Sequence, residues 1–452
     1  MNLSAFQSPF QRSPQIDAPP KSLELRSLSS SSRREQETDV LILGAGLSGT
    51  SLAHHLIELG YEGRITLLDK RTNFDREQRW CTWSDAPPSL SHLVSHRWNA
   101  WRVNGTVRGQ EREARCTSQQ HTYSEIYAPH FFRSLHDEWR ANGSASGNTN
   151  GRIELVLGEE IGALKPRHDG VVVDASNAPW RAQVVFDTRF HSELDASLDV
   201  STSTARTPFF AQTFVGRVVE FERDVFTANE ITLMDFRLPQ PASAFGAGVH
   251  FGYVLPYSSR RALVETTAFT PDMAHRETHN RLLDHYLRAH YGSDYRMISE
   301  EAGFVPMTSA RPATRTAHER VWRLGVAGGM ARPSSGYAFA NIQRVTQSLA
   351  QHIVAAPGHR LQAAVPPALA LNQIAAPQYR VLDEVFLEAL RTSPEFAGEC
   401  FVSLFSDVPT DCLVRFLTET SSPLDACRII AALPKTPFIT AAMRRVVAHC
   451  AK

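Results

Sequence analysis

The sequence predicts an α/β fold with three parts: a parallel sheet near the N-terminus, an antiparallel sheet, and a helical C-terminal region. Three observations predict it. A glycine-rich turn at residues 44–49 follows a short apolar run and precedes a helical pattern. Residues 212–269 alternate as strands separated by turns do. After Pro366 the apolar residues recur at helical spacing, for example in residues 379–390.

Composition narrows the class of protein. The chain has 452 residues, of which 42% are hydrophobic and 21% charged, as expected of a globular protein with two or three domains. Lysine and arginine together number 47, and so do aspartate and glutamate. This balance argues against a nucleic-acid partner, because such proteins usually carry a basic excess. The six cysteines form no CxxC pair, which favours free thiols in the cytoplasm.

Residues 1–36 are rich in Ser, Pro and Gln and predict a disordered leader. They lack the apolar core of a secretory signal. A transit peptide is the alternative, although Asp17 and Glu24 argue against it. No apolar run reaches the ~18 residues that a membrane-spanning helix needs.

Order is expected to begin at Asp39. Residues 40–43 form a short apolar run typical of a buried parallel strand. Residues 48–59 then predict a helix, and residues 64–69 a second strand. The three elements make a β-α-β unit of about 30 residues that opens a parallel sheet. Residues 85–150 read as irregular and polar, and further strands are expected near residues 171–174 and 182–187.

The turn between the first strand and the helix has the pattern Gly44-x-Gly46-x-x-Gly49. Gly44 permits the tight turn, Gly46 lets the backbone approach a pyrophosphate, and Gly49 lets helix and strand pack closely. The helix N-terminus then offers free N–H groups to phosphates. Asp69 ends the next strand, where a carboxylate accepts hydrogen bonds from ribose hydroxyls. The pattern therefore predicts an adenine dinucleotide, either NAD or FAD.

A second glycine-rich segment, residues 321–339, favours FAD. It reads as a strand that enters a turn at Gly325. The residues of the turn expected to contact the cofactor are Gly328, Gly329, Pro333 and Gly336. Many FAD enzymes of the hydroxylase superfamily carry Gly-Asp at the start of such a segment. Val326 stands here in place of that Asp, which argues against an ordinary aromatic hydroxylase.

These segments predict a discontinuous FAD-binding domain of the glutathione-reductase type over residues 37–355. Segments of a substrate domain are expected to interrupt it at about 85–150 and 205–300. The helical C-terminal region then covers residues 365–452.

Glu265 is the candidate for acid catalysis. It lies in an apolar strand between Val264 and Thr266, where burial would raise the pKa of its carboxyl and keep it protonated. The alternative is a strand glutamate that faces solvent or pairs with an arginine, and periodicity alone favours that alternative.

Several phrases together resemble the bacterial lycopene β-cyclase family, and the resemblance covers roughly residues 38–440. They are Arg79–Ser84, Met234–Arg237, Tyr253–Pro256, Leu263–Thr266, Gly303–Met307, Arg332–Tyr337, Arg380–Leu387 and Arg415–Leu417.

The resemblance implies an enzyme that converts the linear ends of lycopene, or a related linear carotenoid, into β-ionone rings. It implies reduced FAD used without net redox chemistry, with NADPH as the electron source. Glu265 matches the family's acid and would protonate C2 of the ψ end group. Asp235 is a second family position that would support geometry or charge near the acid, or simply pair with Arg237. Loss of the last proton from C4 instead of C6 would give an ε ring, which the residues do not exclude.

A carbocation requires a dry site with aromatic faces. The candidates for this lining are Trp80, Trp83, Phe251, Tyr253 and Tyr337. A redox flavoenzyme of the same fold, such as a monooxygenase or a prenyl-chain reductase, is the first alternative, and a non-catalytic carotenoid-binding flavoprotein is the second.

No metal site is predicted, because Arg276 follows His275 where zincins carry Glu. We interpret His275 and His279 as a solvent-facing helix surface. The insolubility of the implied substrate predicts a cytoplasmic protein with peripheral membrane contact, and the sequence does not indicate an oligomeric state.

Overall fold

The computed structural model describes residues 34–83, 87–145, 152–189, 209–238, 248–310, 320–356 and 377–450. Most of the expected leader lies outside these residues, and the first strand begins at Gln36. In the described part of the chain, no helix has both the length and the apolarity needed to cross a membrane.

The first sheet has seven strands in the order β8-β2-β1-β11-β10-β9, and β17 also pairs with β11. Strands β8, β2, β1, β11 and β17 run parallel, while β9 and β10 are antiparallel additions. The strands are β1 (Gln36–Leu43), β2 (Ile65–Asp69), β8 (Ile153–Leu157), β9 (Ile161–Pro166), β10 (Val171–Ala175), β11 (Trp180–Asp187) and β17 (Val321–Arg323).

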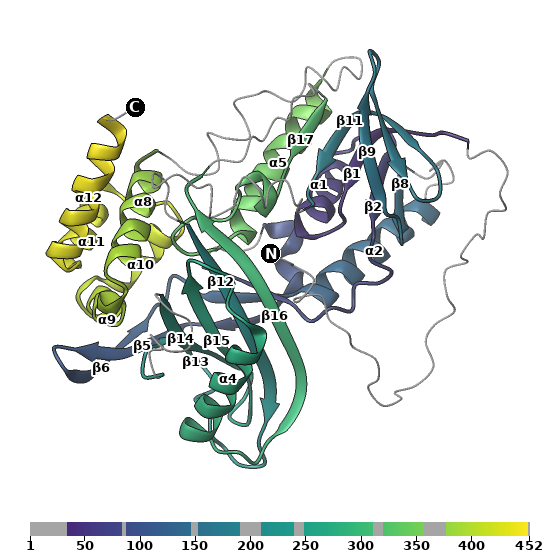
Figure 1. Ribbon diagram of the computed structural model, residues 1–452. Helices are drawn as coiled ribbons and strands as arrows, with labels where there is room; N and C mark the ends of the chain where they lie inside the picture. The colour runs from purple at the N-terminus through teal and green to yellow at the C-terminus, as the bar shows by residue number, and fades with distance from the viewer. Residues whose placement is uncertain are drawn as a thin grey trace.

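Three helices cover one face of this sheet (Figure 1). They are α1 (Leu47–Glu58), α2 (Ala128–Ala145) and α5 (Phe339–Ala355). Every residue of β2 is buried, as expected where parallel strands are covered on both faces. The β-α-β unit predicted from the sequence is therefore confirmed, as is the α/β fold class.

The second sheet also has seven strands, in the order β16-β12-β15-β14-β13-β5-β6. Its pairs are antiparallel except for β13 with β5. The strands are β5 (Ala100–Val107), β6 (Gln110–Thr117), β12 (Phe209–Glu220), β13 (Glu230–Asp235), β14 (Val249–Pro256), β15 (Arg261–Thr270) and β16 (Arg296–Thr308). A small sheet, β3-β7-β4, contains β3 (Arg79–Thr82), β4 (Val94–Trp98) and β7 (Tyr123–Tyr127).

The expectation that residues 85–150 are irregular was wrong. They contain β4 to β7, the 3-10 helix η2 (Pro88–Leu93) and α2. Strand β6 shows why the pattern was missed: its sequence QEREARCT exposes polar or charged side chains at most positions, so it lacks the apolar alternation by which strands are recognised.

The second sheet is covered on both faces. Helix α4 (Arg276–His290) packs on one face, against Val264 and Val254. The C-terminal helices pack with the other face, which includes Leu263 and Phe251. These are α8 (Pro377–Thr392), α9 (Ala397–Asp407), α10 (Thr410–Leu417), α11 (Pro423–Ala432) and α12 (Lys435–Cys450), with the short η5 (Pro394–Phe396) between α8 and α9. They form the yellow group at one side of Figure 1.

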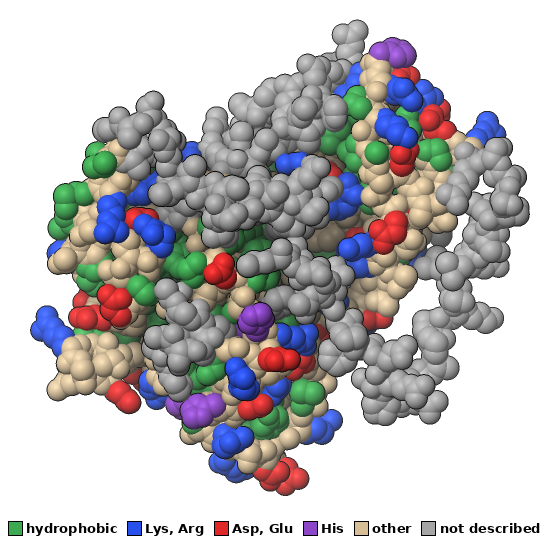
Figure 2. Space-filling model, in the orientation of Figure 1, with side chains coloured by type: hydrophobic (Ala, Val, Ile, Leu, Met, Phe, Trp, Pro, Cys, Tyr) green, Lys and Arg blue, Asp and Glu red, His purple; other side chains and the backbone are tan. Residues whose placement is uncertain are grey.

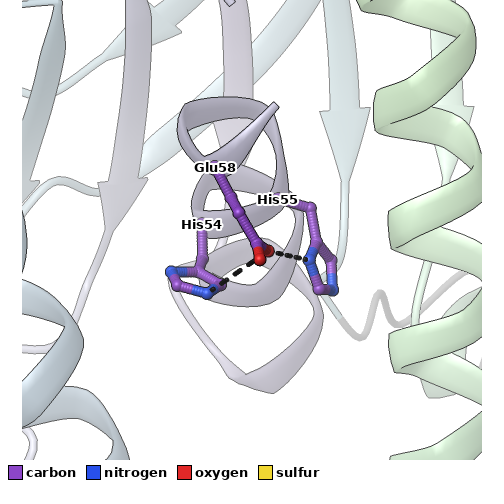
Figure 3. A group of neighbouring side chains, drawn as sticks. All are labelled: His54, His55 and Glu58. Atoms are coloured by element: carbon purple, nitrogen blue, oxygen red, sulfur yellow. Dashed lines mark ion pairs between the residues drawn. The ribbon is translucent and has the colours of Figure 1, made fainter. Parts of the chain in front are cut away.

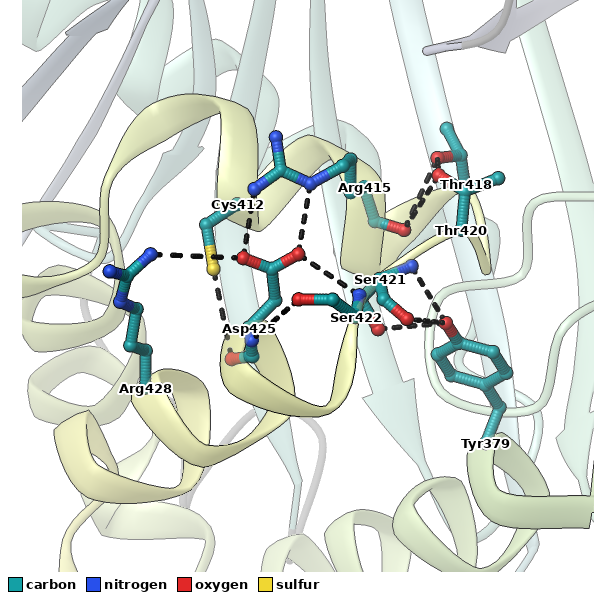
Figure 4. Close-up of polar contacts among 9 residues, drawn as sticks. All are labelled: Tyr379, Cys412, Arg415, Thr418, Thr420, Ser421, Ser422, Asp425 and Arg428. Atoms are coloured by element: carbon teal, nitrogen blue, oxygen red, sulfur yellow. Dashed lines mark hydrogen bonds and ion pairs between the residues drawn. The ribbon is translucent and has the colours of Figure 1, made fainter.

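Polar contacts tie the C-terminal helices together. Asp425 near the start of α11 accepts hydrogen bonds from both Arg415 of α10, at 2.8 and 2.9 Å, and the backbone of Ser422. The Tyr379 hydroxyl of α8 lies 2.7 Å from the Ser421 hydroxyl (Figure 4). The loop between α10 and α11 is thus fixed from two neighbouring helices.

Candidate active site

The three glycines of the turn between β1 and α1 differ in their surroundings: two pack closely against neighbouring atoms, and one borders open space. A Cβ on Gly44, where φ is 95°, would lie 2.6 Å from the Thr188 hydroxyl oxygen. A Cβ on Gly49 would lie 2.1 Å from the Gly44 carbonyl oxygen. Gly46 differs, because no described heavy atom lies within 4 Å of the corresponding position, and it lines a cavity. The turn therefore leaves open space at the N-terminus of α1.

Asp69 lies beside this turn, at the end of β2. Its carboxylate accepts a hydrogen bond from the Ala45 backbone N–H at 2.7 Å and two from the Arg71 guanidinium at 2.7 and 2.9 Å. Burial opposes ionisation, but the Arg71 guanidinium outweighs it, and the pKa of Asp69 is lowered. An ionised carboxylate thus stands next to the open turn.

The second glycine segment reaches the same place from nearly 300 residues away in sequence. Strand β17 pairs with β11, and the 3-10 helix η3 (Val326–Gly328) follows it. A Cβ on Gly325, where φ is 72°, would lie 2.4 Å from the Ser48 hydroxyl oxygen at the start of α1. The two segments that predicted a dinucleotide are therefore neighbours.

Of the residues in this segment that were expected to contact the cofactor, only one lines the cavity. Gly336 lines the cavity, and a Cβ there would lie 2.3 Å from the Gln212 amide oxygen. Val326 lines it as well, but Gly328, Gly329 and Pro333 are not among the lining residues. Gly329 has a φ of 79°, which suits a glycine at the end of the turn.

A single cavity of about 770 Å³ runs from Gly46 to the C-terminal helices. Its size falls within the range of ~300–1,000 Å³ for small-molecule sites. It passes Glu265 on β15, then Phe386 and Phe401, and reaches Ile439 on α12. All the parts of the fold therefore contribute to one mainly apolar space.

Glu265 points into this cavity from β15. The strand alternates, so Leu263, Glu265 and Thr267 line the cavity while Val264 packs toward α4. The carboxyl is buried and accepts a hydrogen bond from the Thr267 hydroxyl at 2.5 Å. Burial, with Glu301 adding to it, raises the pKa of Glu265 to about 8. A protonated acid in an apolar cavity is what general acid catalysis at neutral pH requires.

A buried cluster of ionisable groups surrounds Arg79 on β3. The guanidinium lies 2.6 Å from a Glu301 carboxylate oxygen, 3.1 Å from Glu77 and 3.7 Å from Glu125. Burial raises the pKa of Glu125 to about 7, and the Tyr257 hydroxyl donates to it at 2.7 Å. Arg79 and Glu301 both line the cavity.

Three tyrosine hydroxyls form a second polar group within the cavity. The Tyr123 hydroxyl oxygen lies 2.9 Å from that of Tyr253 and 3.2 Å from that of Tyr337. Tyr253 also donates to the Cys81 sulfur at 3.4 Å. Burial raises the pKa of all three phenols, so they stay protonated and act as neutral dipoles.

Four of the five aromatic residues expected to line the site do so, namely Trp80, Phe251, Tyr253 and Tyr337. Trp83 is buried beside Tyr123, with ring centroids 4.5 Å apart, and is not among the lining residues. Arg79, Tyr123 and Glu301 were not singled out from the sequence. Arg79 lies within the family motif Arg79–Ser84, and Glu301 lies two residues before the motif Gly303–Met307. The motifs indicated these segments but not the role of the two side chains.

Asp235 lies on the α4 face of the second sheet. Its carboxylate pairs with Arg237 at 2.6 Å and accepts a hydrogen bond from Tyr286 of α4 at 2.9 Å. Burial opposes its charge, but Arg237 outweighs burial and lowers the pKa of Asp235. It is not among the cavity-lining residues, although its neighbours Leu233 and Met234 are.

Two histidine groups have structural partners. The interpretation of His279 as solvent-facing was wrong: it is buried, and its ring nitrogens lie 3.0 Å from the Thr213 hydroxyl and 3.1 Å from the Thr266 hydroxyl. On α1, the ligand-type atoms of His54, His55 and Glu58 lie within 4.8 Å of one another (Figure 3). His55 also lies 3.1 Å from the Gln343 amide oxygen, which joins α1 to α5.

Arg332 joins the second glycine segment to the C-terminal helices. It is buried, lies 3.2 Å from the Asp383 carboxylate of α8, and donates to the carbonyl oxygens of Phe416 and Leu417 at 2.7 and 3.0 Å. Ser334 also donates to Asp383, at 2.6 Å. The helical region is therefore anchored directly beside Gly336.

The fold is the one that FAD-binding proteins of the glutathione-reductase type adopt, and solved structures share it. A geranylgeranyl bacteriochlorophyll reductase-like protein from Thermoplasma acidophilum is 14% identical, with a TM-score of 0.56, over 90% of this chain and 99% of that chain. A variant of HpxO from Klebsiella pneumoniae complexed with FAD is 13% identical, with a TM-score of 0.58, over 86% of this chain and 100% of that chain. The flavin-dependent brominase Bmp2 is 12% identical, with a TM-score of 0.57, over 90% of this chain and 99% of that chain.

The chain belongs to the lycopene cyclase family. The family profile described as lycopene cyclase protein matches residues 39–443, which is most of the chain. No curated protein matches it significantly. The family resemblance drawn from the sequence is thereby confirmed.

Proposed function

We propose that the protein is an FAD-dependent lycopene β-cyclase that forms β-ionone rings by acid-initiated isomerisation. The observation that carries the proposal is Glu265, a buried carboxyl with a raised pKa that points into an apolar cavity continuous with the dinucleotide turn. Family membership supports the carotenoid substrate and the cyclisation.

The residues around the turn fit FAD. Open space at Gly46 lies at the N-terminus of α1, where backbone N–H groups would hold the pyrophosphate. Asp69 lies beside the turn, and Arg71, which donates to its carboxylate, lines the cavity where the ribose would lie. Val326 and Gly336 line the same cavity as Gly46 and Glu265. In its reduced form, for which NADPH would be the electron source, the cofactor would supply an electron-rich ring that stabilises positive charge.

The proposed reaction begins when Glu265 gives its proton to C2 of a ψ end group, which leaves a cation at C1. The C5–C6 double bond attacks C1, the ring closes, and the charge moves to C5. Loss of a proton from C6 forms the C5–C6 double bond of the β ring. Substrate and product are isomers, so no electron is gained or lost overall.

The cavity can protect such a cation. Its aromatic side chains, including Trp80, Phe251 and Tyr337, present faces that attract positive charge. The hydroxyls of Tyr123, Tyr253 and Tyr337 lie within hydrogen-bond distance of one another, and burial keeps them neutral. The mainly apolar lining offers few hydrogen-bond partners to water, which would otherwise capture the cation.

A surface for membrane contact lies at the far end of the cavity. Ile430 and Ile439 line the cavity and are 50% and 54% exposed. The C-terminal helices carry further exposed apolar side chains: Val381, Leu424, Met443, Val446 and Val447. Figure 2 shows green surface on the side of the molecule where α11 and α12 lie in Figure 1. We propose that this patch rests on a bilayer and admits the polyene from it.

One experiment tests the activity. Purified protein with FAD, lycopene and a reductant is incubated without oxygen, and the pigment is analysed. Rings at unchanged mass, with no stoichiometric use of NADPH, support the cyclase. A change in mass would indicate a monooxygenase or a reductase instead, and recovery of unchanged lycopene would indicate a binding protein. For the membrane patch, Ile439→Asp should reduce binding to lipid vesicles. The control is Lys165→Asp on β9, far from the C-terminal helices (Figure 1), because the apolar alternative on the same sheet domain, Ile57, packs against the core.

A further inference from the structure

Glu265, Gly216 and Glu301 form one row across the second sheet, named here the carboxylate row. Gly216 on β12 pairs with Glu265 on β15 and with Glu301 on β16. Side chains in one row of a sheet point to the same face. Both glutamates are buried and line the cavity, so the row presents two carboxyl groups to the substrate space.

The central residue of the row lets the two carboxyl groups approach each other. Adjacent strands lie ~4.8 Å apart, so the Cα atoms of the two glutamates are separated by roughly 10 Å, a gap that two glutamate side chains can largely span. A Cβ on Gly216 would lie 3.3 Å from a Glu265 carboxyl oxygen. The Glu265 carboxyl therefore leans over Gly216, toward β16, and Gly216 adds no side chain between the pair.

The two carboxyl groups have different partners. Glu265 accepts from the neutral Thr267 hydroxyl, whereas Glu301 lies 2.6 Å from the Arg79 guanidinium. Burial raises the pKa of both groups, but Arg79 opposes the effect directly at Glu301. The other charged groups near the pair are Arg76, Glu77 and Glu125. The Arg79 guanidinium favours the ionised form of Glu301, while Glu265 has no such partner among the described residues, and this is the arrangement of an acid paired with a base.

We propose that Glu301 is the base that takes the C6 proton from the cyclised cation, an inference that rests on the proposed function. The C6–H bond breaks, its electron pair forms the C5–C6 double bond, and the proton moves to a Glu301 carboxylate oxygen. Glu301 then passes that proton to the Glu265 carboxylate across Gly216, which restores both groups. While Glu301 is neutral, Arg79 keeps Glu77 at 3.1 Å and Glu125 at 3.7 Å as counter-ions.

The test compares Glu301→Gln with Glu300→Gln. Glu300 is the adjacent residue, but it pairs with Arg217 at 3.0 Å and with Arg276 of α4, outside the cavity. Glu301→Gln should slow ring formation by about 10²-fold, as loss of a general base does. The rings that still form should include products with the double bond displaced, because the cation must lose a different proton. Glu300→Gln should give β rings at the normal rate.

Infrared difference spectra of protein with labelled glutamate give a readout independent of turnover. Removal of the Glu301 charge should lower the pH at which the Glu265 carboxyl ionises, and Glu300→Gln should leave it unchanged. If Glu301→Gln does not fold, Glu301→Asp keeps the carboxylate with a shorter reach and should form β rings more slowly without displaced double bonds.

The outcomes separate this inference from the function on which it rests. A wild-type protein that makes no rings overturns the function itself. A cyclase in which Glu301→Gln forms only β rings at the normal rate, with an unchanged Glu265 titration, retains the function and overturns the role of Glu301.

Discussion

Two parts of the candidate site are built in different ways. In the first part, Gly44, Gly46 and Gly49 form a turn within six consecutive residues, and each glycine has a local reason for its place. In the second part, Glu265 and Glu301 come together because both pair with Gly216. The first part depends on backbone conformation and the second on strand register, so substitutions in the two parts should fail in different ways.

The largest effect is expected within the turn itself. Gly46→Val should fold normally but lose bound FAD completely, because the new side chain occupies the open space left for the pyrophosphate. Gly49→Val should instead destabilise the protein, because its Cβ would lie 2.1 Å from the Gly44 carbonyl oxygen. Flavin absorbance and thermal unfolding distinguish the two variants. Loss of stability without loss of flavin in Gly46→Val would contradict the assignment of Gly46 to the cofactor site and of Gly49 to close packing.

The next effect concerns the acid. Glu265→Gln keeps the shape and the hydrogen bond with Thr267 but cannot donate a carboxyl proton, so ring formation should fall by about 10²- to 10⁴-fold. Bound FAD should be retained, because Glu265 belongs to β15 and the turn does not depend on it. The measurement is the rate of ring formation per bound flavin. A variant that retained the full rate would remove Glu265 from its role.

This difference between the two parts of the site also explains what could be predicted from the sequence. The β-α-β unit and its turn are local, so spacing alone located Gly44, Gly46, Gly49 and Asp69. Glu265 was selected through the family resemblance, since strand periodicity by itself favoured an ordinary surface glutamate. Glu301 was missed because its importance depends on its register with Gly216, some 85 residues earlier, and no local pattern reports that register.

The pH dependence is a smaller effect that tests the same carboxyl. Burial raises the pKa of Glu265 from its usual 4.5 to about 8, so the protonation of the substrate should slow tenfold per pH unit above that value. Stability should respond as well, because the folded state keeps a proton that the unfolded chain releases. The free energy of unfolding should therefore decline as pH rises from 4.5 to about 8.

Glu265→Gln supplies the control for the stability measurement. Glutamine does not titrate, so the part of the decline due to Glu265 should disappear in denaturant unfolding curves recorded over this pH range. A variant with the same pH-dependent loss of stability as the wild type would show that the carboxyl is not held protonated by burial.

The smallest effect on activity is expected at Asp235. The family pattern implies a role near the acid, but its carboxylate pairs with Arg237 and Tyr286 on the α4 face of the sheet. Asp235→Asn keeps an acceptor for the Tyr286 hydroxyl and removes the charge that compensates Arg237. The free energy of unfolding should fall by about 1–3 kcal/mol, the cost of an impaired buried contact.

Ring formation per bound flavin should be unchanged in Asp235→Asn, because the cavity-facing positions of the second sheet are occupied by other residues, including Met234. A large loss of rate at unaltered stability would have the opposite meaning. It would show that the Asp235 charge influences the reaction electrostatically from the opposite face of the sheet. The dependence on strand register would then extend from the carboxylate row to β13.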